Sequence, residues 1–129
     1  MPDAISELGP IITSSHRAPE GGDNRLSVIV VGAGGTGGRL IPPLMQLLKR
    51  GDQVAIVDGD HVEDRNLARQ NFRPRDIGEN KAEVMARRYR REGIAVTAFA
   101  TMLTPETLPT VVMTLEAPRY IFLGCVDNS

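Results

Sequence analysis

The stretch Leu26–Gly38, which reads LSVIVVGAGGTGG, decides the fold. Its first half, 26–31, is rich in β-branched residues, and unbroken apolarity of that length is typical of a strand buried on both faces of a parallel sheet. Its second half places Gly32, Gly34 and Gly37 in the pattern G-x-G-x-x-G. There the first glycine permits a tight turn, the second lets the backbone approach a phosphate, and the third lets helix and strand pack closely. The stretch therefore predicts a strand, a glycine turn and a helix, in that order.

Strand-like and helix-like segments continue to alternate after this turn. We expect further strands over 53–57, 94–99 and 120–125, and helices over 39–50, 78–93 and 106–116. The order βαβαβαβ implies a parallel sheet wound in one hand, so the chain is predicted to be a Rossmann-like α/β domain with strand order 3-2-1-4. Because Pro42 and Pro43 lack N–H donors and crowd the preceding turn, we expect the first helix to kink or restart there. Pro109 is expected to weaken the last helix.

Length and composition limit the number of domains and the classes of function that the sequence allows. The 129 residues suffice for one domain, and a net charge of −1 argues against nucleic-acid or membrane binding driven by bulk charge. One cysteine cannot form an internal disulfide or a cysteine-rich zinc site. With no signal peptide or membrane-spanning run visible, we expect a cytoplasmic protein. Residues 1–25 are expected to form a flexible N-terminal arm ahead of a domain over 26–129. The sequence leaves open whether this arm docks on the domain or on a partner.

An aspartate accompanies the glycine turn. Asp58 ends the second predicted strand, about 20 positions after Gly37, and an acidic residue at this distance commonly accepts hydrogen bonds from ribose hydroxyls. The N-terminus of the following helix offers free N–H groups to an anion. Together they predict a nucleotide site, of either the dinucleotide or the ATP type. The alternative, a structural turn followed by a surface aspartate, explains the sequence context less well.

The polar stretch after Asp58 separates these two types. It contains Asn66, Arg69, Gln70 and Lys81. A triphosphate requires such groups, because arginine presents a planar fork to phosphate oxygens and lysine a point charge, whereas a dehydrogenase does not. The stretch favours ATP. An NAD-dependent oxidoreductase remains an alternative, as does a non-catalytic nucleotide-binding fragment or partner subunit.

Three motifs together carry a family resemblance. The sequence reads D-x-D-x-V-x-x-x-N-L-x-R-Q over 58–70, G-x-x-K over 78–81 and C-V-D-N over 125–128. From Leu26 to Asn128 it resembles the ThiF/MoeB family of ubiquitin-activating-enzyme-like adenylyltransferases. The sequence around Ile41–Leu44 also resembles that of the ThiF-type proteins of the plasmid-associated PRTRC system.

The resemblance implies a role for each matching residue. The glycines that would line the ATP phosphates are Gly32, Gly34, Gly35 and Gly37. The resemblance implies that Asp58 binds the ribose, that Asn66, Arg69 and Gln70 reach the phosphates and the adenylate, that Lys81 neutralises phosphate charge and that Asp127 holds Mg²⁺. Asp60 is expected to assist near the metal or to shape the loop. The residues implied to be catalytic are Arg69, Lys81 and Asp127.

The resemblance also implies an activity and a partner. In such enzymes the C-terminal carboxylate of a ubiquitin-like or sulfur-carrier protein, ending in Gly-Gly, attacks the α-phosphate of ATP. Pyrophosphate leaves and an acyl-adenylate remains. A homodimer or larger assembly is implied. The family's domain has further strands, a crossover loop and often two CxxC pairs for zinc, none of which this sequence contains. We therefore expect a domain that is C-terminally incomplete relative to the family, without zinc, whose strand over 120–125 is an unpaired apolar edge.

Some reactive residue types have simpler interpretations. Cys125 follows an apolar strand, where a free cysteine is usually a small packed hydrophobe rather than a nucleophile. His61 is expected to be a solvated loop histidine rather than a general base. The arginines of the run 87–91 flank Tyr89, with acidic residues near them in the sequence, so we expect a solvated helix face rather than a nucleic-acid site.

Overall fold

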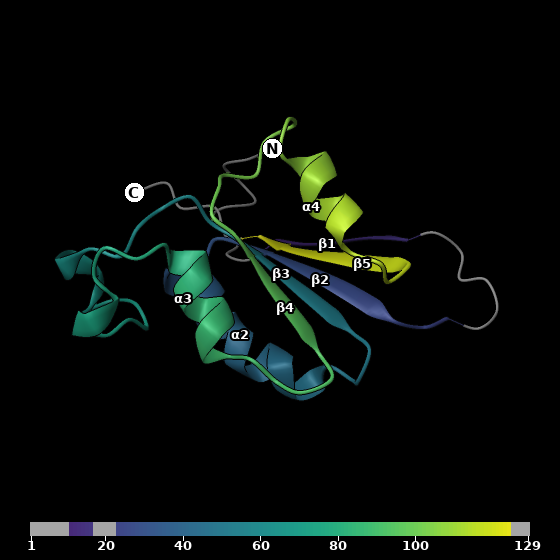
Figure 1. Cartoon of the computed structure of the whole chain (residues 1–129), viewed down its shortest axis with the longest axis horizontal. Coiled ribbons are helices and arrows are strands. Elements are labelled where there is room, and N and C mark those ends of the chain that lie inside the picture. The colour runs from purple at the N-terminus through teal and green to yellow at the C-terminus, as the bar shows by residue number, and fades with distance from the viewer. Residues whose placement is uncertain (1–10, 17–22, 125–129) are drawn as a thin grey trace.

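A five-stranded sheet forms the centre of the molecule. The structure, a computed structural model, describes residues 11–16 and 23–124. The strand order is β1-β5-β2-β3-β4, with β1 at Ile11–His16, β2 at Leu26–Val31, β3 at Gln53–Val57, β4 at Ala95–Phe99 and β5 at Arg119–Gly124. Strands β5, β2, β3 and β4 run parallel to one another (Figure 1). The predicted parallel sheet with order 3-2-1-4 is confirmed.

Strand β1 lies within the stretch that the sequence suggested to be a flexible arm. It pairs antiparallel with β5, with Ile11 opposite Gly124 and His16 opposite Arg119. Residues 11–16 thus dock on the domain, which the sequence had left open. The expectation that the strand over 120–125 would be an unpaired edge is wrong. Its backbone N–H and C=O groups form a ladder with β1, which transfers the exposed edge to that strand.

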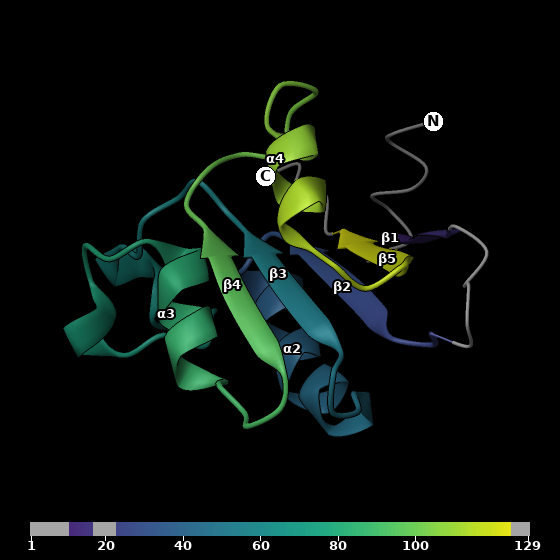
Figure 2. The same cartoon turned by 45° about the vertical axis from the view of Figure 1, so that its right-hand side comes forward.

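Helices cover both faces of the sheet. Helices α2 (Gly35–Leu47) and α3 (Lys81–Arg88) lie on one face, and α4 (Leu108–Thr114) lies on the other (Figures 1 and 2). Successive residues of β2 alternate between two cores: Val28 and Val30 pack with the α2 and α3 side, while Ile29 packs with Val111 of α4. This period of two follows from the pleat of a strand, and burial on both faces explains its continuous apolarity. No helix in the described part of the chain is long and apolar enough to cross a membrane.

Helix α2 runs through its two prolines. It extends from Gly35 to Leu47 with Pro42 and Pro43 inside it, so the expected restart is wrong. Each proline removes one N–H donor from the helix. The buried side chains of Ile41 and Met45, which pack on the sheet, hold the helix across this gap. In α4, Pro109 falls in the first turn, where its missing N–H has no intrahelical partner to lose.

Helix α3 follows the predicted apolar stripe. Ala82, Met85 and Ala86 are buried, and the half-buried Tyr89 packs against the same core. The side chain of Asn80 caps the N-terminus by accepting a hydrogen bond from the Glu83 N–H at 3.0 Å. The helix is shorter than predicted, since it ends at Arg88, and Gly93 turns the chain into β4 with a φ of +85°.

The glycine turn brings β2 and α2 into direct backbone contact. Gly32 has a φ of +93°, a conformation that side chains disfavour. A Cβ added to Gly37 would lie 1.8 Å from the carbonyl oxygen of Gly32. The third glycine of the pattern is therefore required by packing, as the sequence predicted.

We expect Gly37→Ala to lower the free energy of unfolding by about 3 kcal/mol, because the methyl group must push the helix away from the strand. Urea unfolding followed by circular dichroism measures this change. Ala68→Ser, in an exposed turn, is the control and changes stability by less than about 0.5 kcal/mol. An unchanged midpoint for Gly37→Ala would contradict the close contact.

Candidate functional site

The candidate site lies at the carboxyl ends of the parallel strands. Gly32 directly follows β2, and Asp58 directly follows β3. The N–H of Gly32 donates to the carbonyl oxygen of Val57 at 2.8 Å, and the register of β2 with β5 sets Val31 opposite Gly124. Three strand ends therefore meet around the glycine turn. In open α/β sheets, ligands bind at this edge, where the strand order reverses.

Asp58 joins the glycine turn to the loop that follows β3. Its side chain is buried, and its two carboxylate oxygens accept hydrogen bonds from the N–H groups of Ala33 and Asp60, both at 2.8 Å. Each carboxylate oxygen has a second lone pair. The geometry thus gives Asp58 a structural role and leaves acceptor capacity for a hydroxyl group.

Asn80 fixes the other end of this loop, and the sequence analysis did not identify it. Its Nδ2 donates to the carbonyl oxygens of Asp58 at 2.8 Å and Asp60 at 3.1 Å, while its Oδ1 caps α3. The neighbouring Lys81 N–H donates to the carbonyl oxygen of Asp60 at 3.0 Å. An asparagine just before a helical stripe is an N-cap signal that could have identified this residue. The main chain of Asp60 shapes the loop, and its side chain is exposed.

Asn66 organises the turn that carries Arg69 and Gln70. Its buried side chain accepts a hydrogen bond from the Glu63 N–H at 2.7 Å through Oδ1, which closes the short helix η1 (Asp64–Asn66). Its carbonyl oxygen accepts from the Gln70 N–H at 2.8 Å. Oδ1 of Asn66 is used within the loop, and the two N–H donors of its Nδ2 are available to a ligand. Arg69 is exposed on this turn.

Gln70 lies directly over the second glycine of the turn. A Cβ added to Gly34 would be 2.4 Å from Gln70 Oε1. This oxygen is buried and has no hydrogen-bond partner among the residues that the structure describes, although an unsatisfied buried acceptor costs about 1–3 kcal/mol. The structure therefore brings together two residues that the sequence assigned to the same site, and it leaves one polar atom there without a partner in the described ranges.

Lys81 brings a positive charge to the first residue of α3. The residue is only 7% exposed, and no residue in the described ranges forms an ion pair with it. An anionic ligand near this side chain would therefore be stabilised by a charge that no described carboxylate neutralises. Gln70 lies within the loop that follows β3, and Lys81 begins the helix that ends this loop.

These features fit the phosphates of a nucleotide. The N-cap of helix α2 is Gly34, which provides no capping side chain, and the first turn of the helix contains no acidic residue. The N–H groups of a helix's first turn have no intrahelical acceptor, so they are available to an anion. Asp127, the predicted Mg²⁺ ligand, lies outside the described residues, as does Cys125. Within 11–16 and 23–124 no group of three or more His, Cys, Asp or Glu is arranged to hold a metal.

Other polar and charged residues have different surroundings. His61 is exposed, as expected for a loop histidine. Arg25 lies at the opposite end of β2, where its guanidinium holds the pKa of the half-buried Asp23 carboxyl below its usual range through a hydrogen bond. The expectation of a solvated arginine face is wrong for Arg88. Its side chain is 15% exposed and forms an ion pair of 2.7 Å with the buried Asp76, because α3 packs against the loop there.

The ThiF family model matches residues 23–129. The chain belongs to the ThiF family. It is 40% identical, over 94 residues, to a sulfur carrier protein adenylyltransferase of Thermus thermophilus, covering 68% of this chain and 34% of that protein. It is 35% identical, over 86 residues, to the NEDD8-activating enzyme E1 catalytic subunit of Dictyostelium discoideum, covering 66% of this chain and 19% of that protein. The chain thus spans about a third or less of the length of these relatives.

Solved structures of ATP complexes share this fold. Escherichia coli TcdA, a tRNA N6-threonylcarbamoyladenosine dehydratase in complex with ATP, matches with a TM-score of 0.60 and 26% identity, covering 74% of this chain and 39% of that one. Escherichia coli MccB with ATP matches with a TM-score of 0.54 and 31% identity, covering 74% and 28% respectively. The match to this ThiF-type fold confirms the fold class predicted from the sequence.

We expect Asn80→Ala to lower the free energy of unfolding by about 2 kcal/mol, because it removes the α3 cap and two donors to the loop. Asn80→Asp keeps the capping acceptor and loses only the donors, so about half of that loss is expected. Urea unfolding of both variants measures the difference. Equal stability of the two variants would show that the donors to Asp58 and Asp60 contribute nothing.

Proposed function

We propose that this chain contains the ATP-binding part of an adenylyltransferase that activates the C-terminal carboxylate of a ubiquitin-like or sulfur-carrier protein. The observation that carries the proposal is the placement of Gln70 over Gly34, with Lys81, which is 7% exposed, at the start of the helix that follows the same loop. A glycine turn that binds no ligand would not need a glutamine over the second glycine or a lysine at the start of α3. Membership of the ThiF family and 40% identity to a sulfur carrier protein adenylyltransferase support the same assignment.

The proposed reaction transfers the adenylyl group to a carboxylate. One carboxylate oxygen of the partner's C-terminus attacks the α-phosphorus of ATP, and the bond from that phosphorus to the bridging oxygen of the leaving pyrophosphate breaks. Negative charge grows on the phosphate oxygens, and preorganised donors lower the barrier where that charge develops. Lys81 and Arg69 supply positive charge, Gln70 and the first-turn N–H groups supply donors, and Asp58 accepts from the ribose.

The remaining assignments belong to the same proposal. Mg²⁺ held through Asp127 would neutralise phosphate charge. The partner is proposed to end in Gly-Gly, and the enzyme to act in the cytoplasm as a homodimer or larger assembly. The narrower resemblance to the PRTRC-system proteins stays a prediction. An NAD-dependent oxidoreductase would account for the glycine turn and for Asp58, but it gives no role to Lys81 or Arg69.

ATP–pyrophosphate exchange in the presence of a sulfur-carrier protein tests the proposal. We expect Arg69→Ala and Lys81→Ala each to lower the exchange rate by about 10²–10³, since each removes one preorganised charge. Arg65→Ala is the matched control: Arg65 is exposed in the same loop and pairs with Glu63, so its exchange rate stays within about twofold.

The outcomes separate the candidate functions. Normal turnover of both the Arg69 and Lys81 variants would overturn their roles. Tight NADH binding without ATP binding, measured by calorimetry, would favour the oxidoreductase. ATP binding without exchange would favour a nucleotide-binding subunit that does not catalyse adenylation.

A further inference from the structure

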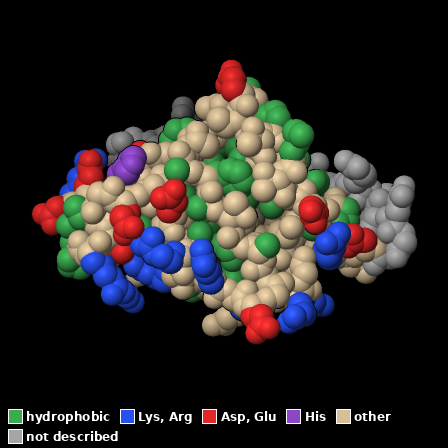
Figure 3. All heavy atoms as spheres, in the orientation of Figure 1, with side chains coloured by type: hydrophobic (Ala, Val, Ile, Leu, Met, Phe, Trp, Pro, Cys, Tyr) green, Lys and Arg blue, Asp and Glu red, His purple; other side chains and the backbone are tan. Residues whose placement is uncertain are grey.

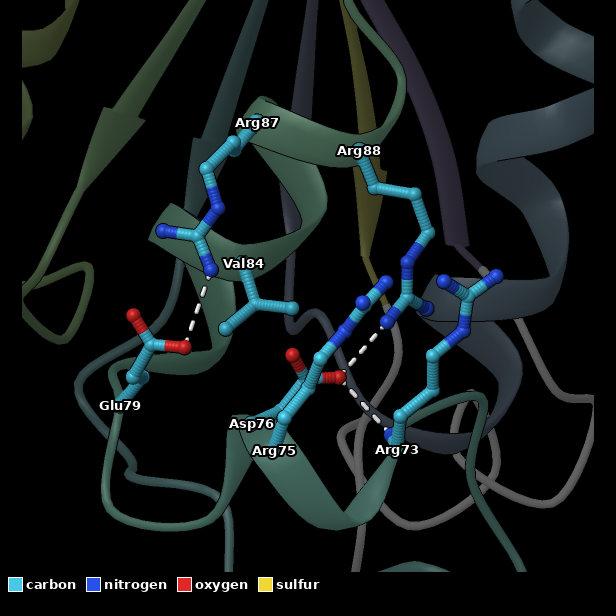
Figure 4. A pocket seen from close by; sticks show the side chains of 7 residues that line it. All are labelled: Arg73, Arg75, Asp76, Glu79, Val84, Arg87 and Arg88. Carbon is cyan, nitrogen blue, oxygen red and sulfur yellow. Dashed lines mark hydrogen bonds and ion pairs between the residues drawn. The ribbon is translucent and has the colours of Figure 1, made fainter.

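A second candidate binding site lies between the loop and α3, outside the nucleotide site. A cavity of about 390 Å³ opens between the short helix η2 (Pro74–Asp76) and α3 (Figure 4). Four arginines line it: Arg73, Arg75, Arg87 and Arg88. None of them belongs to the family motifs that point to ATP. Cavities of this size take a small ligand or a few side chains of a partner.

Two carboxylates hold part of this cluster in place. Asp76, which is 3% exposed, accepts from Arg88 Nη2 at 2.7 Å and from the Arg73 N–H at 2.8 Å. Glu79 pairs with Arg87 at 3.0 Å. Figure 4 shows these contacts joining η2 and the segment after it to α3. The walls of the cavity are therefore fixed by ion pairs whose charges already balance.

The other two guanidinium groups have no such partner. Arg73 and Arg75 are exposed, and neither guanidinium forms an ion pair or hydrogen bond with a residue that the structure describes. Their charges are not balanced by the two carboxylates of the cavity. Arginine pairs with a carboxylate through two parallel N–H···O bonds. Two neighbouring guanidinium groups therefore suit a ligand that carries carboxylate groups.

Charge is distributed unevenly along the chain. Eight of its fifteen basic side chains lie between Arg69 and Arg91, where there are three acidic ones, although the net charge of the chain is −1. Figure 3 shows Lys and Arg side chains gathered over the α3 part of the molecule. A patch of one sign attracts a partner of the opposite sign and accelerates their encounter.

The structure favours an acidic protein segment over a nucleic acid. Single-stranded nucleic acids stack their bases on exposed aromatic rings, but Phe72 is 6% exposed and Tyr89 packs on the core with its hydroxyl bonded to Asn71. The apolar Val84 in the lining gives a contact for an aliphatic side-chain stem.

We propose that this cavity binds an acidic segment of a partner protein, with Asp or Glu carboxylates of that segment pairing with Arg73 and Arg75. This inference goes beyond the proposed adenylation and does not depend on it, because the cavity lies outside the nucleotide site. It assigns to this surface of the chain the recruitment of a protein.

Titration of the full chain with a blocked peptide of alternating Glu and Gly tests the proposal. We expect saturable binding with a Kd on the order of 1 mM or tighter, weakened about tenfold or more by Arg73→Gln combined with Arg75→Gln. The matched control is Arg39→Gln with Arg90→Gln, which removes the same charge from two other exposed arginines and leaves binding within about twofold. Backbone amide shifts of residues 73–76, followed by NMR, give a second readout.

Other ligands serve as comparison arms. Binding of the corresponding Gln–Gly peptide with equal affinity, or an equal loss in the control variant, would overturn the proposal. Tighter binding of an oligouridylate at the same residues would replace the acidic segment with a nucleic acid, and binding of inorganic phosphate without the Glu–Gly peptide would indicate a phosphate site instead. The ATP–pyrophosphate exchange rate of the Arg73/Arg75 variant is measured in the absence of the peptide. It tests the adenylation proposal separately from peptide binding.

Discussion

The carboxylate of Asp58 is the contact on which the candidate nucleotide site depends. It accepts one N–H from the glycine turn and one from the loop after β3, so two segments that are distant in sequence share a single buried side chain. Asn80 adds a second link, since its amide donates to the carbonyl oxygen of Asp58 itself. The glycine turn, the start of the polar loop and the start of α3 therefore form one rigid unit. Gln70 lies within that loop, and Lys81 is the first residue of the helix that follows it.

The buried carboxylates of this structure stabilise the fold, whereas several basic side chains are available to ligands. Asp52 is a further example: it is 8% exposed and accepts from the N–H groups of Leu26 at 2.9 Å and Lys49 at 2.7 Å. Asp76 does the same between η2 and α3. A carboxylate with several donors is stabilised in the interior, where an unpaired charge is costly. The basic residues Lys81, Arg73 and Arg75 have no such partners among the described residues, and this contrast suits sites for anions.

Much of the fold followed from short-range patterns. The apolar runs predicted the four parallel strands, and the glycine pattern predicted the turn whose close contact Gly37 makes. The wrong expectations share a cause, which is that tertiary packing outweighed a local rule. Pro42 and Pro43 remain inside α2 because the helix packs on the sheet, β5 is covered because residues 11–16 reach it, and Arg88 leaves solvent because Asp76 lies beneath it. The N-cap signal at Asn80 was overlooked, whereas its donation to the carbonyl oxygens of Asp58 and Asp60 depends on the tertiary fold.

The sequence by itself determined the alternation of strands and helices, the family and the set of polar residues that follow β3. It could do so because periodicity and motif spacing are properties of neighbouring residues. Only the tertiary structure decided which groups meet: Gln70 over Gly34, Asp58 between the turn and the loop, and four arginines around one cavity. These contacts join residues far apart in the chain, and their geometry depends on how the loop folds back onto α3, which no local pattern specifies.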